Sequence, residues 1–290
     1  MTAAWSTPAA LPVIRVGTPI MVRPGNRLHI GVDPRRGVLV ELHPHIDAHQ
    51  VAELLESLRQ PCDPPEIVTR AQSLGLTAHD VDSILDRLVT DGSADPPCAQ
   101  NPEGITLRVV LGGRGPLTQL LRVSLAEADL LVTEPDDGGN LVVLTDFLVP
   151  DPTLVNSLLN QRIPHLQVRV RDDVGLVGPL VLPGLSSCLR CADLHRSSLD
   201  PEWPILAAQL IGRPGRASDA TIHATAALAH GQIEELATTL RRPTPGDRPP
   251  LVDRVLHLLP DPLGVEFSSW PPHPQCGCRR PLSCGGERKL

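Results

Sequence analysis

The sequence predicts an α/β protein with two domains, and three observations lead to this division. Between residues 19 and 92, short apolar runs separated by turn residues are followed by three amphipathic segments. A Pro-rich stretch, Asp95–Pro102, then reads as a linker. From Ile105 onward, apolar strands alternate with helices, which is typical of a mostly parallel sheet. A chain of 290 residues can form two cores, and we predict domains at 1–98 and 99–290.

The composition excludes several functional classes. A net charge of −7 and a pI near 5.9 argue against broad nucleic-acid binding. No apolar run reaches the ~18 residues that cross a bilayer, and the first twelve residues lack the pattern of a signal peptide. Seven cysteines without an export signal indicate a reducing compartment, so we expect a cytoplasmic protein without a membrane partner.

The first domain begins with three predicted strands and continues with three helices. The strands are bounded by turns that contain Pro, Gly, Asn or Asp, and they are expected at Pro19–Arg23, Arg27–Val32 and Gly37–Leu42. The helices show apolar residues on one face and are expected at Ala48–Arg59, at Pro64–Leu74 and from the N-cap Thr77 to Gly92. This order of elements fits a winged helix-turn-helix.

A winged helix can bind DNA or a peptide. The last helix carries His79, Asp80, Asp82, Asp86 and Asp91 against the single Arg87, a surface that would repel phosphate. The same shape offers a sheet edge beside a helix, where an extended peptide can add as another strand. The sequence therefore favours peptide binding over DNA binding.

The second domain contains half of a dinucleotide-type glycine loop. Gly113 and Gly115 follow a predicted strand, Thr106–Leu111, and precede a helix at Leu117–Leu125. Thr118 stands where a third glycine is expected, and Pro116 removes one amide that would bind phosphate. The loop predicts a vestigial nucleotide site rather than a working one.

Two acidic residues complete this vestigial site. Glu134 follows the second predicted strand, Asp129–Thr133, and could form a hydrogen bond with a ribose hydroxyl. Asp146 follows the third, Leu141–Thr145, at a position where α/β folds often place a metal or phosphate ligand. A plain strand-end acid that caps a loop is the more common role for a residue in the position of Asp146.

The rest of the domain is expected to contain further helices and strands. We expect helices at Thr153–Gln161, Glu202–Ile211 and Ala220–Leu240, a strand at His165–Val170, and an antiparallel pair formed by Val252–Leu259 and Gly264–Ser269.

Two close thiol pairs, Cys188/Cys191 and Cys276/Cys278, predict a structural zinc site that joins the middle of the chain to its C-terminal region. A redox pair remains an alternative for Cys188 and Cys191. Cys284 and His195 are reserve ligands.

The run Gly178-Pro-Leu-Val-Leu-Pro-Gly-Leu-Ser-Ser-Cys-Leu-Arg-Cys191, with Cys276-Gly-Cys278, resembles the ThiF-like family of ubiquitin-activating-type adenylyltransferases. The continuation from Asp193 to Pro204, after a winged helix, looks like one branch: leader-peptide-binding partners of cyclodehydratases that make azoline peptides such as bacteriocins. The resemblance implies a Rossmann-like domain with structural zinc, a recognition-element-like winged helix, a precursor leader peptide and a YcaO-type cyclodehydratase as partners, and pairing of two chains as a homodimer.

Departures from the family pattern argue against catalysis by this chain. Its only lysine is Lys289, and no cysteine lies between Cys191 and Cys276. We therefore expect a non-catalytic scaffold that does not use ATP. The predicted peptide contacts are Val38, Val40 and Leu42 on the last strand and Leu85, Leu88 and Val89 on the third helix. An active adenylyltransferase and a DNA-binding regulator are the alternatives.

Overall fold

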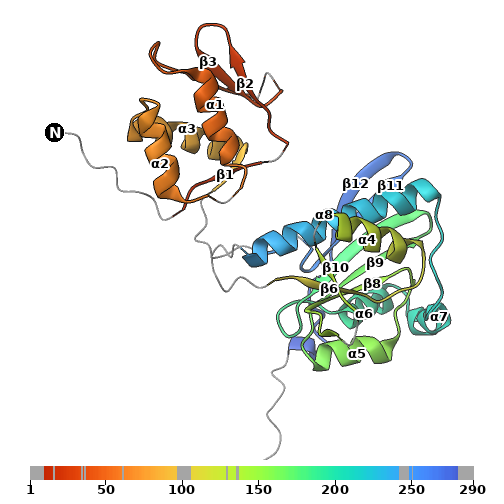
Figure 1. Ribbon diagram of the computed structural model, residues 1–290. Helices are drawn as coiled ribbons and strands as arrows, with labels where there is room; N and C mark the ends of the chain where they lie inside the picture. Colours follow the sequence, from red (N-terminus) through yellow and green to blue (C-terminus); the bar gives the residue numbers. More distant parts are fainter. Residues whose placement is uncertain are drawn as a thin grey trace, which may run out of the picture. The chain divides into compact units, whose positions relative to one another are not determined.

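The computed structural model describes residues 10–15, 17–33, 35, 37–60, 62–96, 106–128, 130–134, 137–241, 248–249 and 251–279. The chain divides into two compact units, Met1–Pro102 and Glu103–Leu290 (Figure 1). Most of the expected linker, together with Cys98, Asp129, Arg280 and Cys284, lies outside the described residues.

The first unit contains one three-stranded antiparallel sheet, a short strand pair and three helices. The sheet has the order β2 (Ile20–Arg23), β3 (Arg27–Ile30), β4 (Val38–Glu41). The short strands β1 (Val13–Ile14) and β5 (Ala94–Asp95) pair with each other, and the helices are α1 (Ala48–Ser57), α2 (Pro64–Ser73) and α3 (Ala78–Asp91). The predicted strands and helices are thus present, with ends that differ by a few residues.

Helix α3 begins and ends where the sequence signals it. The Thr77 hydroxyl accepts a hydrogen bond from the Asp80 amide, and the Asp80 carboxylate accepts one from the Thr77 amide, which forms a capping box. Gly92 ends the helix in the left-handed conformation, with φ of 79°. Between these ends, one face of α3 packs into the apolar core of the unit.

The second unit is built on a seven-stranded sheet in the order β12-β11-β10-β9-β8-β6-β7. Its strands are β6 (Arg108–Leu111), β7 (Leu131–Val132), β8 (Leu141–Thr145), β9 (His165–Arg171), β10 (Val174–Val181), β11 (Arg254–Pro260) and β12 (Leu263–Ser269). Its helices are α4 (Pro116–Glu127), α5 (Pro152–Asn160), α6 (Leu189–Leu199), α7 (Trp203–Leu210) and α8 (Asp219–Arg241).

The sheet is mixed, which refines the expectation of a mostly parallel sheet. The strands β7, β6, β8 and β9 are parallel to one another, and β9 to β12 continue the sheet as antiparallel neighbours. Parallel pairing of consecutive strands requires a long crossover connection, usually a helix, whereas β9 and β10 are joined directly by a turn at Asp172 and Asp173, two residues with positive φ. The parallel part is the Rossmann-like half of the domain.

Helices cover the two faces of this sheet. Helices α4 and α8 pack against one face and form the main core with alternate residues such as Val168 and Val170 of β9. Helices α5 and α6 lie on the other face, as Figure 1 shows, where a smaller apolar cluster includes Cys188 and Cys191. Among the described residues, no helix combines the length and the apolar character that crossing a bilayer would take.

Candidate functional site

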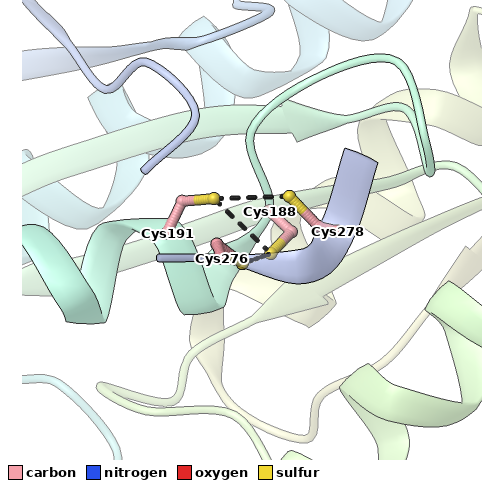
Figure 2. Close-up of side chains that lie close together, drawn as sticks. All are labelled: Cys188, Cys191, Cys276 and Cys278. Atoms are coloured by element: carbon pink, nitrogen blue, oxygen red, sulfur yellow. Dashed lines mark hydrogen bonds between the residues drawn. The ribbon is translucent and has the colours of Figure 1, made fainter. Parts of the chain in front are cut away.

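The four cysteines that the sequence analysis paired come together at one point of the second unit (Figure 2). Cys188 is the N-cap of α6 and Cys191 lies in its first turn, while Cys276 and Cys278 come from the C-terminal segment around the short 3-10 helix Gly277–Arg279. All four sulfur atoms lie within 4.8 Å of one another.

The spacing of the sulfur atoms fits a tetrahedral metal site. Sulfur atoms at ~2.3 Å from a central zinc ion would stand about 3.8 Å apart. The separations are 3.9 Å for Cys188–Cys191, 3.6 Å for Cys188–Cys276 and 3.4 Å for Cys191–Cys278. The four thiols are free, and these separations are too long for disulfide bonds. The arrangement therefore could hold a metal ion.

The electrostatics of the cluster also favour a cation. The Cys188 thiol donates toward Cys191, which raises the pKa of Cys188 together with burial and lowers that of Cys191 to about 4. Burial raises the pKa of Cys278 to about 12. Thiols this close cannot all ionise by themselves, since each thiolate repels the next. A divalent cation would remove this barrier and bind all four as thiolates.

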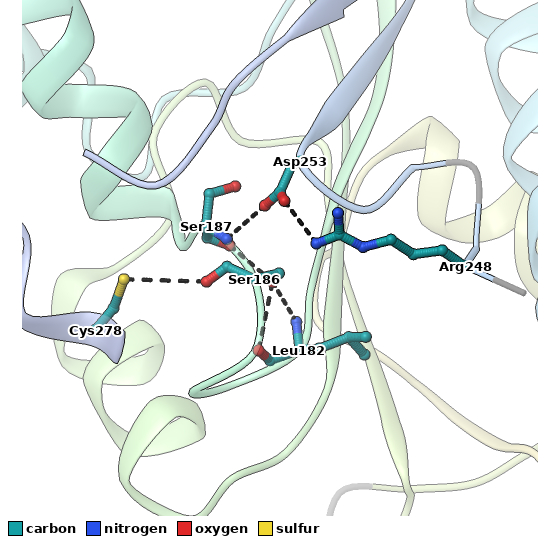
Figure 3. A network of polar contacts seen from close by, with 6 residues as sticks. All are labelled: Leu182, Ser186, Ser187, Arg248, Asp253 and Cys278. Atoms are coloured by element: carbon teal, nitrogen blue, oxygen red, sulfur yellow. Dashed lines mark hydrogen bonds and ion pairs between the residues drawn. The ribbon is translucent and has the colours of Figure 1, made fainter. Parts of the chain in front are cut away.

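A polar network holds the loop that leads into the first cysteine pair (Figure 3). The Asp253 carboxylate accepts hydrogen bonds from the Ser187 amide at 2.6 Å and from the Arg248 guanidinium at 2.7 Å. The Ser186 hydroxyl accepts from the Leu182 amide at 2.8 Å. These contacts fix the backbone immediately before Cys188, so the first pair is placed by the sheet and the hairpin strand β11.

His195 is not brought into the cysteine cluster. Its Nε2 atom forms a hydrogen bond with the Pro271 carbonyl oxygen at 2.8 Å, and its ring lies against Trp270 and His273. Among the described residues that could ligate a metal together, the cluster consists of the four cysteines. Arg190, which stands between Cys188 and Cys191 in the sequence, is exposed to solvent.

The glycine loop holds a carboxylate of the protein itself. Asp146 is 4% exposed and accepts hydrogen bonds from the amides of Gly115, Leu117 and Thr118, at 2.9, 3.0 and 3.3 Å. The Thr118 hydroxyl also donates to it. These amides form the N-terminus of α4, which in nucleotide-binding loops faces a phosphate group. In this chain, Asp146 supplies the negative charge at that position.

The two glycines of the loop are required by close packing. A Cβ atom at Gly113 would collide with the Thr145 hydroxyl, and one at Gly115 would stand 2.5 Å from the Asp146 carboxylate. Glu134 lies apart from this arrangement, since it is exposed and pairs with Arg122 at 3.4 Å. The residues predicted as a vestigial nucleotide site therefore form a closed loop around Asp146, and Glu134 remains outside it.

We expect the variant Asp146→Ala to be less stable than the wild type by about 2–4 kcal/mol, because two buried amides and one half-buried amide lose their acceptor. Urea denaturation followed by circular dichroism measures this difference. The matched control is Asp151→Ala, since the Asp151 side chain accepts a hydrogen bond from one amide as the N-cap of α5. This substitution should lower the stability by about 1 kcal/mol. Equal losses for the two variants would contradict the role given to Asp146.

Four of the six side chains predicted to contact a peptide are buried in the first unit. The exposed fractions are 6% for Val38, 5% for Val40, 4% for Leu85 and 0% for Leu88. They belong to the core between sheet and helices, which corrects the prediction that these side chains touch a peptide directly. Leu42 and Val89 are half-buried at the margin of that core. An alternating pattern in the sequence shows that one face of a strand is apolar. It does not show whether that face packs against the protein's own helices or is open to a peptide.

The backbone of β4, unlike its buried side chains, lies where another strand could pair with it. The strand lies at the edge of its sheet and pairs only with β3 in the described part of the unit. The Leu42 amide donates a hydrogen bond to the Asn26 carbonyl oxygen. In this antiparallel ladder the backbone amide and carbonyl groups of Val40 and Val38 therefore point toward β3. Leu39 and Glu41, between them, direct their backbone groups outward. Arg87 of α3 donates to the Leu39 carbonyl at 2.8 Å.

Comparison with known proteins yields structural likeness without sequence likeness. No protein-family model and no curated protein sequence matches the chain. Two solved heterocyclase structures are similar: a heterocyclase in complex with substrate and cofactor (18% identity, TM-score 0.62) and the heterocyclase TruD (17%, 0.61). Each likeness covers 93% of this chain but only 39% and 42% of the heterocyclase chains.

In a second group of similar structures, the likeness covers almost the whole of the other protein's chain. The microcin C7 biosynthetic enzyme MccB in complex with N-formylated MccA has 11% identity and a TM-score of 0.54, and E. coli MccB with ATP has 11% and 0.55. Each likeness spans 92% of this chain and 99% of MccB. At these identities the comparisons establish a shared fold.

Proposed function

We propose that this chain is a non-catalytic scaffold that binds the leader of a precursor peptide and presents it to a YcaO-type, ATP-dependent cyclodehydratase. The observation that carries the proposal is the outer edge of β4, where Leu39 and Glu41 direct backbone groups away from the sheet beside α3. The fold likeness to heterocyclases, one of them in complex with substrate, and to MccB in complex with N-formylated MccA, is consistent with it.

In this proposal the leader pairs with β4 as a fourth strand. Main-chain hydrogen bonds supply affinity, and side chains of the leader reach toward α3. The Arg87 bond to the Leu39 carbonyl oxygen ties α3 to the strand beside which the leader would lie. Leu42 and Val89, which are half-buried, can border a bound peptide, whereas the buried residues support the groove from beneath.

Binding of this kind needs no bond-making by the chain. A leader held on the scaffold raises the effective concentration of the attached core peptide at the partner's active site. The N-terminal unit acts as the winged-helix recognition domain, with the boundary proposed near residue 98, and the ThiF-like unit acts as the support, its four cysteines holding zinc. We place this activity in the cytoplasm, with two copies of the chain able to pair.

The closed glycine loop argues against the adenylyltransferase alternative. A nucleotide phosphate at the N-terminus of α4 would have to displace Asp146 from three amides and would then lie beside its negative charge. The described second unit also contains no lysine to counter the phosphates. Exposed Asp82 and Asp86 on α3 similarly disfavour the DNA-binding alternative.

The experiment that tests the function uses short peptides translated from reading frames beside this chain's gene. Fluorescence anisotropy of each labelled peptide should identify one that binds the isolated chain, and the neighbouring cyclodehydratase should modify that peptide faster when the chain is added. ATP–pyrophosphate exchange by the isolated chain would instead support the adenylyltransferase, and salt-dependent binding of promoter fragments would support the regulator.

A further inference from the structure

The sheet face opposite the main core carries a cluster of basic side chains that neither the metal site nor the β4 edge uses. Arg169 of β9 lies opposite Leu176 of β10, which lies opposite His257 of β11, so these three side chains share one face. Arg171 lies two residues along β9 on the same face, and Arg196 approaches from α6. Helix α6 covers this face of the sheet (Figure 1).

Two of the three arginines have a carboxylate partner. Arg171 pairs with Asp172 at 3.5 Å, and Arg196 pairs with Asp193 at 2.9 Å. Arg169 is the most buried of the three, with 5% of its surface exposed. Its Nε atom is fully covered and has no hydrogen-bond partner among the described residues.

The surroundings of Arg169 add positive charge. Burial lowers its pKa to about 9, the charges of Arg196 and Arg171 act in the same direction, and the charge of Asp193 opposes them in part. The pKa of His257 is lowered by burial and by the charges of Arg171 and Arg169. A buried guanidinium without a partner is costly, and proteins ordinarily pair such a group or use it to bind a ligand.

Aromatic side chains shape the position next to this cluster. The Arg196 guanidinium lies over two indole rings, 5.1 Å from the centroid of Trp203 and 5.0 Å from that of Trp270. Asp193 accepts from the Trp203 indole at 3.1 Å, and the Ser268 hydroxyl accepts from that of Trp270 at 2.9 Å. Arg196 is therefore held in place. Arg171, which is 40% exposed, marks the side open to solvent.

We propose that Arg169, Arg171 and Arg196 form a binding site for a small oxyanion, of the size of phosphate or a carboxylate group. A planar guanidinium binds two oxygen atoms of such a group side by side. The anion would supply the charge that Arg169 lacks, and the other two arginines would contribute from the rim. This site is independent of peptide binding, because it uses no residue of the first unit.

Intrinsic fluorescence can report binding directly. The chain has three tryptophans and no tyrosine, and two of the tryptophans, Trp203 and Trp270, contact the arginine cluster. In a Trp5→Phe background, emission therefore comes from the site itself. Phosphate added to the metal-loaded protein should change the emission in a saturable manner, and chloride at equal ionic strength should not. At a phosphate concentration about ten times the dissociation constant, the melting temperature should rise by about 3 °C or more.

Variants separate a binding role from a packing role. Arg169→Met should abolish the phosphate response and, in phosphate-free buffer, melt no lower than the wild type, because it removes an unpaired buried charge. Arg169→Lys should respond more weakly. Arg108→Met, which changes an exposed arginine of β6, is the matched control and should respond like the wild type.

The choice of anion distinguishes the sources of the ligand. A response to phosphate and sulfate but not acetate indicates a phosphate-type ligand, and an equal response to acetate indicates a carboxylate. The proposal fails if wild-type emission and melting temperature are the same in all four salts. It also fails if Arg169→Met retains the full response, or if that variant loses stability in phosphate-free buffer without any anion effect in the wild type.

Discussion

The purified chain should contain one zinc ion per molecule, and Cys191→Ser should lose it together with much of the stability of the second unit. Cys191 is completely buried, and its sulfur lies 3.4 Å from that of Cys278, so its loss would release the C-terminal segment as well as the metal. Structural zinc contributes ~10–16 kcal/mol in small domains. Even a third of this amount would lower the melting temperature by about 10 °C.

Elemental analysis and thermal denaturation measure these two effects, and a chelator added to the wild type should reproduce the second. Cys62→Ser is the matched control, because Cys62 is a free, half-buried cysteine of the other unit. It should retain zinc and the wild-type melting temperature of the second unit. A wild-type protein with far less than one metal ion per chain, or Cys191→Ser protein with the full amount, would exclude the metal site.

Leu39→Pro should weaken leader binding at least tenfold while leaving the first unit folded. Proline removes the Leu39 amide, which in the register of β3 and β4 points out of the sheet, so the sheet itself loses no hydrogen bond. A bound strand would lose one main-chain bond and meet the proline ring at the edge. A tenfold change corresponds to about 1.4 kcal/mol, close to the value of a single hydrogen bond.

The control for this variant is Val22→Pro. The same alternation places the Val22 amide on the opposite edge of the sheet, on β2, so this proline should leave peptide affinity unchanged. Fluorescence anisotropy with the labelled leader and circular dichroism of each variant give the two measurements. Equal affinities for Leu39→Pro and the wild type would place the peptide elsewhere. Leu88→Asp is unsuitable as a test, because Leu88 is fully buried and its change would unfold the unit.

The sequence predicted best those features that depend on local pattern. The cap at Thr77, the end at Gly92 and the apolar face of the third helix are present in the structure because each depends on neighbouring residues. The joining of two distant cysteine pairs was also predictable, since two thiol pairs at metal-ligand spacing commonly hold one metal ion.

Other features that depend on packing between distant segments were not predicted. The antiparallel pair of β11 and β12 was expected from its turn and is confirmed, but the antiparallel pairing of β10 with β9 and β11 was not, because the apolar run of β10 resembles those of the parallel strands. Helix α6 was missed because its first turn contains the cysteine pair and its apolar pattern is weak. The sequence favoured a loop-capping role for Asp146, but not the particular amides it caps, because its carboxylate turns back to α4 from a backbone with φ of 71°.

The separation of 88 positions between Cys188 and Cys276 has a consequence for synthesis. During translation the whole sheet leaves the ribosome before the second thiol pair appears, so the nascent domain must remain folded, or be held by a chaperone, with only half of its ligands. Products that stop before Cys276 could bind zinc only loosely through Cys188 and Cys191. If the four cysteines hold a metal ion as proposed, its capture would therefore follow synthesis of the whole sheet.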